Sequence, residues 1–212
     1  FYEIFNNTSS FNKVVKNVLP EFDFIPSSIR LSFVDTLLSN EVSREKKLQK
    51  ILEPISERYD FIFIDVNPSI SILNRNAIIA SDVVNIVCEA QPYSFYGMET
   101  LLQEFAQLGE LTKSKVVNFN VMLNKFELQI KTHMEIATAL QQHNEINSKL
   151  CDAVIKKSED FNIAAKENTP VIFLRGRKRS SSKEDLINLG KELLLKSTSK
   201  VNESESEVVN AA

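Results

Sequence analysis

Apolar residues follow two alternating spacings along the chain, and this alternation predicts strands that take turns with helices. Short, nearly continuous apolar runs predict buried strands at 22–25, 60–65, 83–88, 116–123, 153–155 and 170–173. Between them, apolar residues at helical spacing predict helices at 11–19, 28–38, 45–57, 70–80, 95–109, 127–143, 159–167 and 183–196. Because parallel strands need such helical crossovers, we predict an α/β fold with a mostly parallel, twisted sheet and helices on both faces.

The composition is that of an ordinary globular protein. The chain has 212 residues, of which 43% are apolar and 25% charged. A net charge of −3 argues against a uniformly basic nucleic-acid coat, although a local basic patch is compatible with it. No apolar run approaches the roughly 18 residues that span a bilayer. We predict one domain over 1–196, incomplete at its N-terminus, and a disordered acidic tail over 197–212.

Neither the thiols nor the imidazoles form a metal-binding pattern. Cys88 lies in an apolar run and Cys151 among helical residues, so we expect reduced thiols in the core or partly buried. His133 and His143 lack a partner at ligand spacing, and a surface or packing role is expected for each.

The most informative feature is an apolar run that ends at a carboxylate, Phe61–Asp65, followed by the turn Asn67-Pro68-Ser69. In parallel sheets, ligands bind beyond the carboxyl ends of the strands. A carboxylate at such an end can hold Mg²⁺ directly or through water. The alternative is a solvated loop aspartate or the N-cap of the next helix.

A glycine-rich phosphate loop does not accompany this carboxylate. No Gly-x-x-x-x-Gly-Lys-Ser/Thr motif occurs, and the four glycines stand singly. The chain begins with Phe1 in the middle of a pattern. We therefore expect a preceding segment that carries the loop, and we expect this chain alone not to hydrolyse ATP.

The densest positive cluster is Arg175-Gly176-Arg177-Lys178-Arg179, and Lys156 and Lys157 precede it. One interpretation is a solvated loop. The other is a patch that contacts phosphates and binds DNA without regard to sequence and with strong salt dependence.

Several blocks, in order, resemble the ParA family of plasmid and chromosome partition ATPases, which are deviant Walker-type P-loop proteins. Ile25–Leu31 is similar to the family's Ile-Pro-Ser-Asn-x-x-Leu segment, and Tyr59–Ser69 to its Tyr-Asp-hydrophobic-Asp-x-Pro-Pro-Ser strand and switch. Gln91–Gly97 resembles the family's Gln-Pro-x-x-x-x-x-Gly element with one residue fewer before the glycine, while Thr169–Val171 and Leu189–Leu193 resemble the closing elements.

The resemblance implies ATP and Mg²⁺ as cofactors. Asp65 would position Mg²⁺ and its waters, and Asn67, Pro68 and Ser69 would form the switch that senses the γ-phosphate. Pro170 would line the adenine pocket. Asn124 ends an apolar strand before a lysine, which is similar to the base-recognition Asn-Lys of several P-loop nucleotidases.

The resemblance also implies partners and a location. It implies an ATP-bound homodimer that binds DNA non-specifically, is stimulated by a centromere-binding partner, and works on the nucleoid in the cytoplasm without a membrane. Lys157 falls where the family often has a basic residue that contacts DNA, and Arg175, Arg177, Lys178 and Arg179 extend that candidate surface.

Two residues depart from the family pattern. Asn67 stands where the family usually has proline, and Asp160 occupies a position that is often basic. The first change is expected to loosen the switch, and the second weakens the candidate DNA surface, for which Arg175 to Arg179 would compensate.

Two alternatives remain at the level of sequence. A MinD-like, membrane-cycling division-site ATPase would end in a basic amphipathic helix, whereas residues 202–207 are acidic and aperiodic. A non-catalytic remnant of the fold would lack the glycine-rich loop in its source gene as well.

Overall fold

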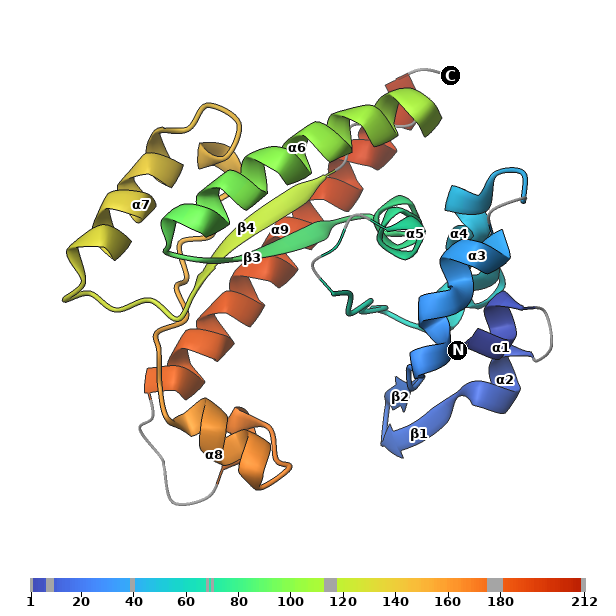
Figure 1. The fold of residues 1–212 in the computed structure, drawn as a ribbon, viewed down its shortest axis with the longest axis horizontal. Coiled ribbons are helices and arrows are strands. Elements are labelled where there is room, and N and C mark those ends of the chain that lie inside the picture. The colour runs from blue at the N-terminus through green and yellow to red at the C-terminus, as the bar shows by residue number, and fades with distance from the viewer. Residues whose placement is uncertain are drawn as a thin grey trace. The chain divides into compact units, whose positions relative to one another are not determined.

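The protein divides into two compact units, Phe1–Asp82 and Val83–Ala212, each taken by itself below. The computed structural model (Figure 1) describes residues 2–6, 10–38, 41–67, 69, 71–112, 118–174 and 181–210. The single domain predicted over 1–196 stays a prediction.

The first unit combines short helices with one hairpin. Its helices are α1 (Tyr2–Phe5), α2 (Phe11–Val14), α3 (Val34–Leu38), α4 (Lys47–Leu52) and α5 (Ile72–Ala80), with 3₁₀ turns η1 (Ile29–Phe33), η2 (Arg44–Lys46) and η3 (Glu53–Arg58). Strands β1 (Lys16–Leu19) and β2 (Phe22–Phe24) pair antiparallel, with Lys16 opposite Phe24. Glu21 takes a left-handed conformation, φ 62°, in the turn between them.

The core of this unit forms where α1, α3, α4 and α5 meet. Phe5, Val34, Leu38, Leu48 and Ala77 are buried together. Apolar contacts from distant parts of the sequence therefore hold helices that are too short to be stable alone.

Asn76 ties this core together through its side-chain amide. It is completely buried, and its Oδ1 accepts the Leu48 N–H at 2.9 Å. Its Nδ2 donates to the carbonyl oxygens of Arg44 at 2.9 Å and Ile72 at 2.8 Å. These bonds link η2, α4 and α5, and they offset the cost of burying a polar group.

The second unit is built on a parallel strand pair. Strands β3 (Val84–Glu89) and β4 (Phe119–Asn124) pair in register, from Val84 opposite Phe119 to Glu89 opposite Asn124. Two isolated parallel bridges add to this pairing. Val121 of β4 pairs with Leu150, and Phe126, just after β4, pairs with Lys156.

Helices flank this pair. They are α6 (Pro92–Thr112), α7 (Lys131–Gln142), α8 (Asp160–Lys166) and α9 (Ser181–Asn210), with 3₁₀ turns η4 (Asn147–Lys149) and η5 (Val171–Phe173). Helix α6 runs along the strands (Figure 1), and its Phe105 ring packs on Phe119 of β4 with centroids 5.7 Å apart. Glu192 of α9 accepts the N–H groups of Asp152 at 3.0 Å and Ala153 at 2.9 Å. The predicted α/β fold with parallel strands is confirmed.

The structure differs from the predicted strand at 60–65. Residues 61–67 have no regular secondary structure, and the side chains of Phe61 and Phe63 are 54% and 83% exposed. A strand exists only where a neighbour accepts its backbone hydrogen bonds. No described residue pairs with this segment, so Phe61, Ile62 and Phe63 stay at the surface, whereas Ile64 is half-buried against the core of the first unit.

Other predicted boundaries were wrong for local reasons. The helix predicted over 11–19 ends at Val14, and Lys16–Leu19 is a strand, as the β-branched Val15 and Val18 favour. The helix predicted over 45–57 becomes a 3₁₀ turn from Glu53, next to Pro54.

Helix α9 ends at Asn210. The disorder that the sequence predicts over 197–212 stays a prediction. Within the described parts of the chain, no helix combines the length and hydrophobicity that a membrane span requires.

Candidate nucleotide and DNA sites

The segment after the apolar run presents oxygen atoms at the surface of the first unit. Asp65 and Asn67 are exposed. The Ser69 hydroxyl donates to Oδ1 of Asn67 at 3.2 Å, and the Ser69 N–H donates to the Asn67 carbonyl at 2.9 Å. Pro68, the remaining predicted switch residue, lies outside the described residues.

Asn74, which the sequence pattern did not single out, anchors this loop. Its Nδ2 donates to the carbonyl oxygen of Asn67 at 2.7 Å and also to that of Ser69. Its own N–H donates to Oγ of Ser71, the N-cap of α5, at 3.2 Å. The Ser71 cap was the available signal, because it places Asn74 in the first turn, facing back toward the loop.

The side-chain oxygen of Asn74 differs from its nitrogen in having no hydrogen-bond partner among the described residues. This oxygen, Oδ1, is buried. A buried acceptor of this kind is normally satisfied by a protein group or by an ordered water molecule.

The donor set of the loop fits Mg²⁺. A carboxylate (Asp65), an amide oxygen (Asn67) and a hydroxyl (Ser69) are hard oxygen ligands, and the carboxylate is accessible. Mg²⁺ usually takes one or two protein carboxylates and completes its shell with water and phosphate oxygens. Among the described residues, no group of three or more His, Cys, Asp and Glu side chains could by itself hold a metal ion, so any Mg²⁺ here would depend on phosphate and water for most of its ligands.

In the second unit, polar side chains gather at the carboxyl ends of β3 and β4. Glu89 and Asn124 are opposite each other in the ladder, and the ammonium group of Lys125 pairs with the Glu89 carboxylate. Oδ1 of Asn124 accepts the Lys125 N–H at 2.9 Å, while Lys125 has a left-handed φ of 53°. Asn124 thus sits at the strand end where ligands bind in parallel sheets.

Pro170 lies between α8 and η5. It is the N-cap of η5, and its carbonyl oxygen accepts the Phe173 N–H at 2.9 Å. The neighbouring Val171 and Leu174 are buried with Ala164 of α8. A small apolar cluster therefore fixes the backbone around Pro170.

The candidate DNA residues fall in the second unit. Lys157 forms an ion pair with Glu127, Nζ to Oε1 3.0 Å, and its side chain is 64% exposed. Asp160, the residue that departs from the family pattern, is buried at the start of α8, where the helix dipole stabilises a carboxylate. Arg175, Arg177, Lys178 and Arg179 lie outside the described residues.

The predicted state of the cysteines is confirmed, since Cys88 and Cys151 are free and buried. Burial, together with the nearby Glu89 carboxylate, raises the pKa of Cys88 to about 11. Burial also raises the pKa of Cys151. Both thiols therefore stay protonated near neutrality and are poor nucleophiles.

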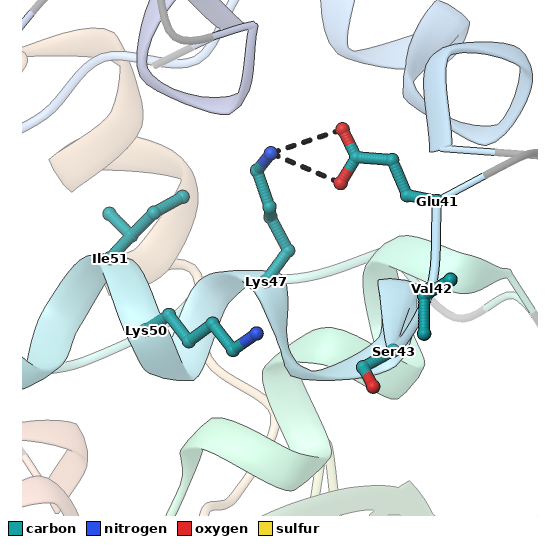
Figure 2. A pocket seen from close by; sticks show the side chains of 6 residues that line it. All are labelled: Glu41, Val42, Ser43, Lys47, Lys50 and Ile51. Atoms are coloured by element: carbon teal, nitrogen blue, oxygen red, sulfur yellow. Dashed lines mark hydrogen bonds and ion pairs between the residues drawn. The ribbon is translucent and has the colours of Figure 1, made fainter.

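A separate pocket of about 330 Å³ lies in the first unit (Figure 2). Lys47 Nζ lies 3.1 Å from each carboxylate oxygen of Glu41, so these two charges in the pocket lining neutralise each other. None of the predicted site residues lines it.

Comparisons with known proteins agree with this architecture. The AAA domain family profile matches residues 1–119. Cell division protein PomZ of Myxococcus xanthus is 30% identical over 158 residues, 74% of this chain and 49% of PomZ. Sporulation initiation inhibitor protein Soj of Bacillus subtilis is 27% identical over 193 residues, 91% of this chain and 75% of Soj.

Among solved structures, a putative plasmid partition protein from Borrelia burgdorferi B31, bound to AMPPNP, superimposes with a TM-score of 0.74. It is 21% identical, and the match covers 92% of this chain and 74% of that protein. This likeness shows the fold, which is that of P-loop NTPase-like α/β proteins.

Within that class, the chain belongs to the ParA family of partition ATPases, in the AAA domain family. The chain spans 49% of PomZ and 48% of an uncharacterised Methanocaldococcus jannaschii relative.

Proposed function

We propose that the whole protein is an ATP-switched homodimer that segregates a plasmid or a chromosome. In its ATP state it binds DNA non-specifically on the nucleoid in the cytoplasm, and a centromere-binding partner stimulates hydrolysis and release. The observation that carries this proposal is that the loop after Asp65 is hydrogen-bonded to α5 through Asn74, in a chain of the ParA family.

For the nucleotide, we assign the metal side of the site to this loop. Asp65 would hold Mg²⁺ through its waters, and Asn67, Pro68 and Ser69 would respond to the γ-phosphate. Bound Mg²⁺ would neutralise charge on the phosphate oxygens. Because Asn74 holds the carbonyls of Asn67 and Ser69, a rearrangement of the loop is transmitted to the first turn of α5.

For the base, we assign Asn124 and Pro170. The Asn124 Oδ1 already accepts a backbone N–H, which fixes the side chain and leaves its Nδ2 as the donor offered to a ligand. The backbone around Pro170 is held by the Val171 and Leu174 contacts, so it supplies a rigid wall.

For DNA, we assign Lys157 together with Arg175, Arg177, Lys178 and Arg179. These side chains would contact backbone phosphates, which accounts for binding without sequence preference in a protein of net charge −3.

The test is binding of the whole protein to a labelled DNA duplex of arbitrary sequence, with ATP and Mg²⁺, with ADP, and without nucleotide. Tight, salt-sensitive binding only with ATP is expected. Equal binding in all states, or no binding, would contradict the proposal.

A further inference from the structure

Glu127 forms an ion pair with the ammonium group of Lys157, the same group that the proposed function assigns to DNA. Oε1 of Glu127 lies 3.0 Å from Nζ of Lys157. The side chains of Lys157 and Glu127 are 64% and 25% exposed. The pair therefore lies at the surface, where a phosphate oxygen has access to the same ammonium group.

Both the side chain and the backbone of Glu127 are held in position. Gln129 Nε2 donates to its Oε2 at 3.3 Å. The Glu127 N–H donates to Nδ1 of His133 at 3.1 Å, and the His133 ring packs on Phe126. The Lys157 N–H in turn donates to the Phe126 carbonyl at 3.2 Å. The two partners thus come from adjacent backbone segments that are bonded to each other, which keeps the two side chains within reach of one another.

The neighbouring lysine shows what a purely structural pair looks like. Lys156 Nζ lies 2.8 Å from Oδ1 of Asp185, whose side chain is only 9% exposed. Oδ2 of Asp185 also accepts the Lys156 backbone N–H at 3.2 Å. Removing Lys156 from that pair would leave a buried carboxylate without its cation, which is costly. The Glu127 carboxylate, in contrast, reaches solvent and can be released cheaply.

We propose that Glu127 is an internal competitor of the DNA backbone and thereby sets the DNA affinity of this surface. A phosphate that binds Lys157 competes with the Glu127 carboxylate for the same ammonium charge, and a carboxylate that is released takes up a cation from solution. This inference rests on the proposed function, and it explains how a protein that must let DNA go limits the strength of one of its own contacts.

The test is the affinity of the whole protein for a DNA duplex, with ATP and Mg²⁺, over a series of KCl concentrations. Glu127→Gln keeps the shape of the side chain and the backbone bond to His133. It should tighten binding about twofold to fivefold, the range expected when an exposed ion pair no longer competes. It should also make the salt dependence steeper, because no cation is taken up by the released carboxylate.

The matched control is Glu135→Gln. Glu135 pairs with Lys131 of the same helix at 3.4 Å, with its side chain 59% exposed, and the substitution changes the net charge equally. It should leave the affinity within experimental error of the wild type. The thermal midpoint of each variant is measured alongside, to verify that the protein is folded.

A double-mutant cycle with Lys157→Gln separates competition from long-range charge. In the Lys157→Gln background, Glu127→Gln should no longer tighten binding. Three results would overturn the inference while leaving DNA binding intact. Glu127→Gln would tighten DNA binding in the Lys157→Gln background as well, Glu135→Gln would tighten it equally, or Glu127→Gln would not tighten it at all. Failure of the wild type to bind DNA in any nucleotide state would overturn the proposed function and this inference together.

Discussion

The side-chain amide of Asn74 donates to the carbonyl oxygen of Asn67 at 2.7 Å and also to that of Ser69. These two hydrogen bonds join the loop after Asp65 to the first turn of α5. The loop is therefore attached to a helix whose opposite side, through Asn76, is bonded to η2 and α4. A change at the loop has a physical route into the core of the first unit.

Replacing Asn74 with alanine should free the loop. Two backbone carbonyls lose their donor, so we expect the free energy of unfolding to fall by about 1 to 2 kcal/mol, as measured by urea titration. Asn162→Ala is the matched control, since the Asn162 amide donates to the exposed Glu159 side chain and its loss should cost less than about 0.5 kcal/mol. Equal losses would contradict the anchoring role.

Replacing Asn76 with leucine should be far more damaging. The Leu48 N–H and the carbonyls of Arg44 and Ile72 would lose a buried partner, so we expect the free energy of unfolding to fall by at least about 3 kcal/mol. Asn162→Leu serves as the exposed control. A fall below about 1 kcal/mol would show that the core repacks around the substitution.

The sequence predicted well what depends on local pattern. The apolar runs placed β3 and β4, and their alternation with helices indicated the parallel pairing that the ladder from Val84 to Glu89 shows. The position of Asn124 at a strand end followed from the same reasoning, although its role in binding remains a prediction.

What the sequence did not predict depends on partners distant in the chain. Phe61 to Ile64 have the pattern of a buried strand, yet a strand needs a neighbour, and none of the described residues supplies one. Likewise, the pattern cannot show that the Asn74 amide points back to Asn67, or that Glu127 reaches Lys157 across 30 residues. Such contacts follow from the packing of the backbone.

The stability of the protein should depend on Cys88 at high pH. Its pKa is raised from 9.0 to about 11 in the folded state, chiefly by burial. The unfolded chain releases this proton near its ordinary pKa. The stability contributed by the neutral thiol is therefore complete below about pH 9 and is lost as the pH rises toward about 11. Cys88→Ala should flatten the fall in unfolding free energy over this interval, as measured by urea titration at each pH. Parallel curves for variant and wild type would contradict it.

The basic cluster should contribute to the salt dependence of DNA binding. Changing Arg177, Lys178 and Arg179 to glutamine in the whole protein should lower DNA affinity and flatten the plot of log affinity against log salt, by about 0.9 for each phosphate that is no longer neutralised. The control is the triple change of Lys13, Lys16 and Lys50 to glutamine, which alters the net charge equally at exposed positions of the first unit. An unchanged slope in the cluster variant, or the same change in the control, would remove the cluster from the DNA surface.

The proposed role of Asp65 at the metal side of an ATP site is tested most directly by the rate of ATP hydrolysis by the whole protein. Phosphate release is measured with and without Mg²⁺ and non-specific DNA, for the wild type and for Asp65→Asn, which removes the charge but keeps the size. We expect Mg²⁺-dependent hydrolysis that DNA stimulates in the wild type, and a rate at least about 100-fold lower in the variant. Hydrolysis that is absent from the wild type, or that is equal in the two proteins, would contradict it.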